Sequence, residues 1–278
     1  MVDGGMDNLL ATHFAHLFIR DPIVVFAEDL KELDLSKADH FENLQSTNWQ
    51  HMRFKPPPPG TDMGWRVEFR PMEIQITDFE NAAFSIFIVL ITRAILSYDL
   101  NFYIPITRVS ENMETAHIRD AVGTQKFWFR KDPFSPRARG GTGTATPRED
   151  SRPPTPVGPV EDEYEQMSIN DIINGQSPSG EGFPGLIPLV ESYLNSMNVD
   201  VETRCELARY LDLIRKRADG TYWTAAKWIR GFVQGHQQYA KDSVVNDDIT
   251  FDLVKEVEAI TKNEGRDGKG AEMLGRRR

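Results

Sequence analysis

The sequence predicts an α+β fold, in which a sheet with packed helices is followed by a mainly helical C-terminal region. Two observations support this prediction. Residues 65–77 alternate apolar and charged side chains and are rich in aromatic and β-branched residues, which is typical of a strand with one buried face. Residues 78–98 and most of residues 161–262 instead repeat apolar residues at helical spacing.

Composition divides the chain into four segments. We expect residues 1–132 to form the domain that contains the sheet, and residues 161–262 to form the helical region. Residues 133–160 are rich in Pro, Gly, Thr and Arg and have little to bury, so we expect a disordered insertion there. Residues 263–278 are rich in Gly and charge, and we expect a disordered tail.

Charge and cysteine content limit the class of function. The formal net charge of −10 disfavours nucleic acid as a general partner, because phosphate binding needs a basic surface. The single cysteine, Cys205, excludes an internal disulfide framework and indicates a reducing, cytoplasmic location; we expect a buried, inert thiol. No signal-peptide pattern is visible, and the longest apolar run, Ala82 to Ile91, is too short to span a bilayer, so we expect no membrane partner.

The N-terminal elements are a helix, an extended arm and a turn. Apolar residues at helical spacing predict a helix over residues 6–19. The prolines from Pro56 to Pro59 fix φ and lack N–H donors, so they predict a stiff extended arm. Residues 60–64 predict the turn that leads into the strand.

The predicted strand from Trp65 to Thr77 has one apolar and one charged face. Before Pro71, the apolar face holds Trp65, Val67 and Phe69, and the charged face holds Arg66, Glu68 and Arg70. After Pro71 the phase of the apolar residues reverses. Because one extra residue exchanges the two faces, we predict a bulge at Pro71 that keeps one face apolar throughout.

The remaining elements are helices and one short strand. The helix over residues 78–98, with Asp78 as its N-cap, is apolar on nearly all sides and is expected to be buried. A polar helix over residues 110–122 and a strand over 127–130 follow, and from residue 161 we expect helices only. These helices cover residues 168–173, 183–196, 200–218, 221–239 and 247–262, with Ser168, Asp200 and Thr221 as N-caps of three of them.

The charged face and the segment before it hold the candidate site residues. Four side chains could bind anionic oxygens: Arg53, Lys55, Arg66 and Arg70. Glu68 and Glu73 could hold a divalent cation through oxygen ligands. Trp49 either stacks beneath a substrate or is a core tryptophan. The alternative for the whole face is a solvated edge of an antiparallel sheet.

Several long motifs carry a resemblance to a known family. They include STNWQHMRFKPPPP (residues 46–59), GWRVEFRPMEIQITDFENAAF (64–84), MSINDIINGQ (167–176) and FPGLIPLVESYL (183–194). In this order they resemble the C-terminal portion of the eukaryotic glutamate–cysteine ligase catalytic subunit. The resemblance implies part of a glutamine-synthetase-like antiparallel sheet, curved around the site, with helices outside.

The resemblance also implies a reaction and residue roles. The family uses ATP and Mg²⁺ to join the γ-carboxyl of L-glutamate to the amine of L-cysteine through a γ-glutamyl phosphate, the first step towards glutathione. On the VEFRP motif, Glu68 resembles a magnesium-binding carboxylate, and Arg70 resembles the catalytic arginine that meets the transferred phosphate. Trp49 and Arg53 belong to a matched motif and are assigned to substrate binding. A modifier subunit is a possible partner.

The sequence departs from the family in length. The family's magnesium cluster draws further glutamates from N-terminal strands, and only Glu68 of that set is obvious here. We therefore expect this chain alone to be inactive and prone to aggregate. Two alternatives remain: a non-catalytic truncated form that binds a full-length ligase or modifier subunit, and an unrelated anion-binding module built on Arg53, Lys55 and Arg70.

Overall fold

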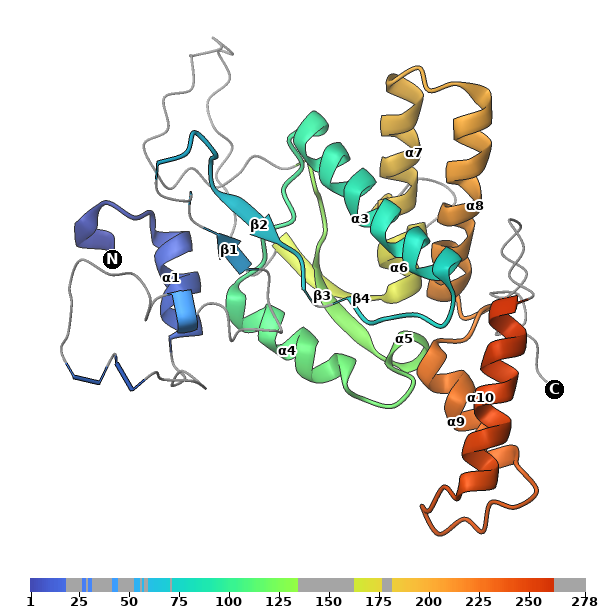
Figure 1. Cartoon of the computed structure of the whole chain (residues 1–278). Helices are drawn as coiled ribbons and strands as arrows, with labels where there is room; N and C mark the ends of the chain where they lie inside the picture. Colours follow the sequence, from blue (N-terminus) through green and yellow to red (C-terminus); the bar gives the residue numbers. More distant parts are fainter. Residues whose placement is uncertain are drawn as a thin grey trace. The chain divides into compact units, whose positions relative to one another are not determined.

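The computed structural model describes residues 1–18, 27–28, 30–31, 42–44, 53–55, 57, 60–70, 72–134, 163–176 and 182–262. These residues form helices and antiparallel strands, which confirms the predicted α+β class (Figure 1). The chain divides into two compact units, residues 1–73 with 138–153 and residues 74–137 with 154–278. The four segments predicted from composition stay a prediction.

The described part of the first unit includes a 3₁₀ helix, an α-helix and a two-stranded sheet. A 3₁₀ helix, η1 (Val2–Gly4), precedes α1 (Asn8–Leu17), which lies within the predicted range 6–19. The Asp7 side chain caps α1 by accepting the backbone N–H groups of Leu9 and Leu10, each at 3.0 Å. Strand β1 (Arg53–Lys55) pairs antiparallel with β2 (Arg66–Glu68).

Strand β2 is much shorter than the predicted strand over residues 65–77. Its ladder with β1 ends at Glu68, and the described residues that follow up to Thr77 have no strand partner among the described residues. Alternation along the chain cannot supply that partner, and a strand exists only where its backbone groups pair with a neighbour. The predicted bulge at Pro71 lies outside the described residues. The expected apolar face is exposed rather than buried at Trp65 and Val67.

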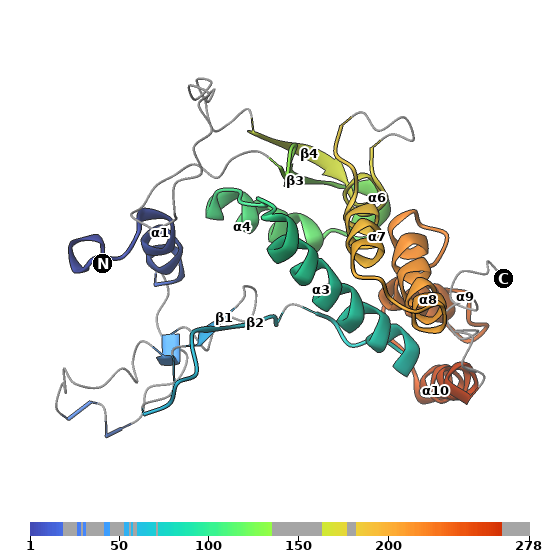
Figure 2. The same ribbon diagram turned by 90° about the horizontal axis from the view of Figure 1, so that it is seen from above.

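The second unit is organised around α3 (Asp78–Tyr98), whose bounds match the prediction. One stripe of α3 packs against α7 (Leu186–Ser196) and α8 (Val201–Ala218), and Figure 2 shows the three helices alongside one another. Buried aliphatic and aromatic side chains fill the space between them: Ala83, Phe87, Leu90, Ile91, Ala94, Ile187, Val190, Tyr193, Leu194, Leu211, Leu213 and Ile214.

Two expectations about α3 are corrected. Thr77, not Asp78, is the N-cap: its hydroxyl accepts the Glu80 N–H at 3.2 Å, while the Glu80 carboxylate accepts the Thr77 N–H at 3.1 Å. This reciprocal capping box requires an acidic residue three positions after the cap, and Thr77 has one. Burial on nearly all sides was also wrong, because Val89 and Leu96 are 57% and 77% exposed.

By length and composition alone, the whole of α3 could cross a membrane, whereas the apolar run from Ala82 to Ile91 within it is too short. This is weak evidence, since the core helix of a globular unit passes the same test. In the described structure the buried stripe of α3 packs on α7 and α8, and its fully buried Glu80 forms an ion pair. Helix α3 therefore has the contacts of a core helix.

A second sheet pairs the segments that come before and after residues 135–162. Strand β3 (Lys126–Arg130) confirms the predicted strand and pairs antiparallel with β4 (Tyr164–Ser168), from Lys126 opposite Ser168 to Arg130 opposite Tyr164. The expectation of helices only from residue 161 was wrong, because β4 pairs with a segment more than thirty positions earlier. Strand β4 has only five residues, which is too few for a clear local period, and its partner lies far away in the sequence.

Side chains of α4 (Ile106–Ala116) anchor this second sheet. Asn112 accepts the Trp128 N–H at 2.7 Å and donates to the Trp128 carbonyl at 2.9 Å. At the end of the ladder, the buried Arg130 pairs with Glu163 at 2.8 Å. In place of the single predicted helix over residues 110–122, the structure has two helices, α4 and the short α5 (Ala121–Thr124).

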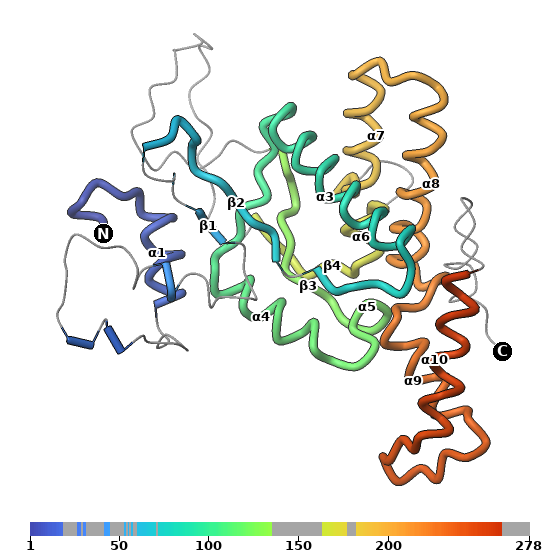
Figure 3. Tube along the Cα trace, viewed as in Figure 1, coloured from blue at the N-terminus to red at the C-terminus, as the bar shows by residue number. Residues whose placement is uncertain are grey.

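The C-terminal helices follow the predicted order, as the trace in Figure 3 shows. They are α6 (Ile169–Asn174), α7, α8, α9 (Ala225–Gly235) and α10 (Asp247–Lys262). Ser168 and Asp200 cap α6 and α8 as predicted, but α9 is capped by Thr224 rather than Thr221. Cys205 is exposed on α8, so the prediction of a buried thiol was wrong.

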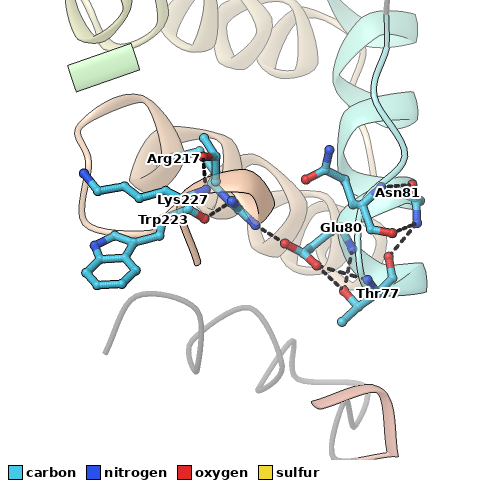
Figure 4. A network of polar contacts seen from close by, with 8 residues as sticks. Thr77, Glu80, Asn81, Arg217, Trp223 and Lys227 are labelled. Carbon is cyan, nitrogen blue, oxygen red and sulfur yellow. Dashed lines mark hydrogen bonds and ion pairs between the residues drawn. The ribbon is translucent and has the colours of Figure 1, made fainter. Parts of the chain in front are cut away.

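A buried ion pair fastens the start of α3 to the end of α8 (Figure 4). Glu80 is fully buried, Arg217 is 7% exposed, and the Arg217 guanidinium donates to the Glu80 carboxylate and to the Trp223 carbonyl. On the other side of Glu80, the Asn81 side chain accepts the Gln75 N–H at 2.9 Å. The segment that enters α3 is therefore held by its own helix and by α8.

Candidate anion-binding site

The pairing of β1 with β2 gathers charged side chains on one face. In the antiparallel register Arg53 lies opposite Glu68, and Lys55 lies opposite Arg66. Since alternate residues of paired strands point to the same side, these four side chains share a face. Strand β1 thus brings two cations from before the proline-rich arm to the strand that follows it.

Glu68 lies at the centre of this cluster. One carboxylate oxygen pairs with Lys55 Nζ, and the other accepts from Arg70 Nε. The hydrogen bond from Lys55, followed by that from Arg70, lowers the pKa of Glu68 to about 2. The carboxylate is therefore ionised at neutral pH, and both its oxygens are already engaged by cations.

The charge of the face is opposite to that of the whole chain. Arg53, Lys55, Arg66 and Arg70 contribute four positive charges and Glu68 one negative charge, a sum of +3 in a chain of formal charge −10. Within the described residues, the buried Nε of Arg53 has no hydrogen-bond partner. This face therefore suits an anion with several oxygens, which guanidinium and ammonium groups bind by charge-assisted hydrogen bonds.

The same residues do not fit a magnesium ion by themselves. Mg²⁺ takes oxygen ligands in near-octahedral geometry, whereas this face offers one carboxylate with a cation at each oxygen. No group of three or more His, Cys, Asp or Glu side chains that could hold a metal occurs in the part of the chain that is described. The metal roles of Glu68 and Glu73 stay predictions, and any further ligands would have to come from elsewhere.

The structure brings three of the four predicted site residues into one face: Arg53, Glu68 and Arg70. The fourth, Trp49, lies outside the described residues. The sequence predicts Lys55 as a residue that could bind anionic oxygens, and in the structure its ammonium pairs with the Glu68 carboxylate. The contact depends on the pairing of β1 with β2 across the proline-rich arm. Alternation of residue types within one segment does not reveal which other segment pairs with it.

Comparisons with known proteins agree on one family. The family model described as "Glutamate-cysteine ligase" matches residues 1–260. The chain is 66% identical to the glutamate–cysteine ligase of Neurospora crassa over 297 residues, which covers 99% of this chain and 41% of that protein. It is 52% identical to the glutamate–cysteine ligase catalytic subunit of Rattus norvegicus, over 91% of this chain and 38% of that protein. It is 37% identical to the Saccharomyces cerevisiae glutamate–cysteine ligase, over 97% of this chain and 38% of that protein. The chain thus spans about two fifths of the length of these relatives.

Proposed function

Because the chain belongs to the glutamate–cysteine ligase family, we propose that the face formed by β1 and β2 binds the phosphates of ATP in the ligation of L-glutamate to L-cysteine. The observation that carries this proposal is the cluster of Arg53, Lys55 and Arg70 around Glu68. Three cations on one face suit a triphosphate, whose negative charge is spread over several oxygens.

The proposed chemistry has two steps. An oxygen of the glutamate γ-carboxylate attacks the γ-phosphorus of ATP, ADP leaves, and an acyl phosphate forms. The cysteine amine then attacks the acyl carbon, phosphate leaves, and the nitrogen loses a proton to give the amide. Activation is needed because a carboxylate oxygen is a poor leaving group until it is phosphorylated.

Arg70 has the clearest role in this scheme. Its guanidinium lies next to the carboxylate of Glu68 on the cationic face. There it can stabilise the negative charge on the phosphoryl group during transfer. Arg53, with its unmatched Nε, is assigned to substrate binding. Trp49 keeps its proposed role in substrate binding, and Glu68 its proposed role as a metal ligand.

The chain supplies only part of such a site. Because it spans about two fifths of its relatives, we propose that it forms one wall of the active site of a longer ligase. The remaining ligands of Mg²⁺ and the rest of the amino-acid pockets would then come from the part of the relatives that the chain does not match. We also propose a cytoplasmic location, because the single cysteine fits a reducing compartment. A modifier subunit is proposed as a partner, because some relatives are named as catalytic subunits.

A chimaera tests this proposal. The 278-residue chain replaces the matching region of the Neurospora crassa ligase, and formation of γ-glutamylcysteine is measured with ATP, glutamate and cysteine. We expect activity, and a loss of about 10³-fold in kcat for Arg70→Ala, as for removal of a group that stabilises transferring phosphoryl charge. The matched control is Arg93→Ala on the exposed side of α3, which should keep full activity. A folded chimaera without ligase activity would reject the proposal.

A further inference from the structure

We propose that Lys55 is a further phosphate-binding residue of this face, and that Glu68 acts as its internal counter-ion until a polyphosphate displaces the carboxylate. This inference rests on the proposed function, in that it concerns the same face and the same class of ligand. It goes further by stating that the phosphate and the Glu68 carboxylate compete for Lys55, which gives Glu68 a role that needs no metal.

The strand register supports this role for Lys55. Lys55 lies directly opposite Arg66, and like charges at directly opposed positions of an antiparallel pair destabilise it. Glu68 is the diagonal neighbour of Lys55, and its carboxylate bonds to the Lys55 ammonium. The carboxylate therefore offsets a repulsion that the two cations would otherwise exert on this short ladder.

The position of Glu68 makes it a competitor of an incoming anion. Its two oxygens occupy Lys55 and Arg70, the cations nearest the centre of the face. All three side chains remain partly open to solvent, so phosphate oxygens can reach the same nitrogens. A triphosphate offers more oxygens and more negative charge than one carboxylate, and it can therefore take over both cations, leaving the Glu68 carboxylate unpaired.

Binding of inorganic tripolyphosphate to the purified 278-residue chain, kept at a concentration at which light scattering detects no self-association, tests the inference. Affinity is measured by calorimetry in the presence of a metal chelator. We expect Lys55→Met to weaken binding about tenfold or more, as for loss of one charge-assisted hydrogen bond, and Lys55→Arg to keep most of it. Glu68→Gln should bind several-fold more tightly than the wild type, because the competing charge is gone. Lys31→Met, which changes an exposed lysine of the same unit, is the matched control and should bind like the wild type.

The opposite response of the Glu68 variant separates this role from a loss of folding, since an unfolded site cannot bind more tightly. The inference is overturned if Lys55→Met binds like the wild type, if Glu68→Gln weakens binding without metal, or if the wild type does not bind tripolyphosphate. Equal affinity for sulfate would likewise reject a polyphosphate site. An inactive chimaera alongside the expected tripolyphosphate results would reject the proposed reaction alone.

Discussion

At the scale of single residues, Arg217 and Glu80 join positions 137 apart through a buried ion pair. Arg217→Met removes one partner and leaves the Glu80 carboxylate buried without its counter-charge. We expect this substitution to lower the free energy of unfolding by about 3–5 kcal/mol, measured by urea denaturation. Arg204→Met, on an exposed part of the same helix, should cost less than about 1 kcal/mol.

A double substitution separates the ion pair from the rest of the network. Glu80→Gln combined with Arg217→Met removes both charges, so it should recover part of the loss caused by Arg217→Met alone. Additive losses would contradict the view that the buried charge of Glu80 is the source of the cost.

The pH dependence of the ion pairs between β1, β2 and Arg70 follows from Glu68. Its pKa is lowered from 4.5 to about 2, so the ion pairs contribute fully above about pH 4.5, and their contribution is lost as the pH falls through about 2. Carbon NMR of the Glu68 carboxyl group should report this low titration. In Lys55→Met the titration should move upward towards 4.5, because Lys55 is the largest cause of the shift. A wild-type midpoint near 4.5 would show that the ion pairs do not form in solution.

Single residues also show which features can be predicted from the sequence and which cannot. The alternation around Glu68 and Arg70 correctly placed both among cations, because side-chain phase in a strand is a local property. The exposure of Cys205 could not be read in this way. It depends on which face of α8 packs on α3, and both faces of that helix hold apolar residues.

At the scale of elements, two glycines bring the end of α6 and the start of α7 into backbone contact. Gly185 has φ +92°, and a Cβ there would lie 2.5 Å from Gly175 N and 2.6 Å from Asn174 C. Gly185→Ala should therefore lower the free energy of unfolding by about 2 kcal/mol or more, since both the conformation and the space exclude a side chain. Gly235→Ala is the matched control: nothing lies within 4 Å, and the thermal midpoint should stay within a few degrees.

The pairing of β3 with β4 predicts that the segment between them, residues 135–162, can be shortened. The Lys131 N–H donates to the Glu163 carbonyl at 2.9 Å, so the chain leaves and re-enters the sheet at paired positions. Replacement of residues 135–162 by a six-residue Gly/Ser linker should keep the fold and raise its stability by about 1 kcal/mol through a shorter loop, as measured by urea denaturation. The same linker placed after Gln166, inside β4, should unfold this sheet. Loss of β3–β4 amide protection in the shortened chain would contradict the prediction.

Elements with a long local period were predicted best. Helix α3 has the expected bounds. Its 21 residues are mostly apolar and lie between an N-cap and Asp99, whose backbone is in the left-handed conformation, and these features specify a helix locally. Strand β2 was predicted too long and β4 was missed, since each depends on a partner far away in the sequence. The residues of the candidate site could thus be named in advance, but the contact of Lys55 with Glu68 required the pairing itself.

At the scale of the whole molecule, the chain presents apolar side chains that a complete sheet would cover. Trp65, Val67 and Phe69 are 62%, 54% and 43% exposed. We expect the purified chain to self-associate at micromolar concentration, as seen by light scattering, because exposed apolar strand residues favour association. Replacement of Trp65 and Val67 by Thr should reduce the association, whereas the same change at exposed Val244 and Val245 should not.

We also expect no ligase turnover from the chain alone. Among the described residues, only Glu68 and Glu73 are predicted to join the proposed metal cluster, and no group of three or more metal-binding side chains occurs there. The electrostatic stabilisation of phosphoryl transfer needs more than this. Measurable formation of γ-glutamylcysteine by the purified chain would overturn this prediction. The chimaera, assayed in parallel, shows that the assay detects the product.

The partner of Glu80 is synthesised long after Glu80 itself. At about 5–20 residues per second, the 137 positions that separate it from Arg217 take a ribosome roughly 7 to 27 s to add. During that interval the nascent chain carries a long apolar helix whose Glu80 still lacks its counter-ion Arg217 and whose covering helices α7 and α8 do not yet exist. Chaperone occupancy along the growing chain should therefore rise once α3 has emerged and fall only after α8 has followed it.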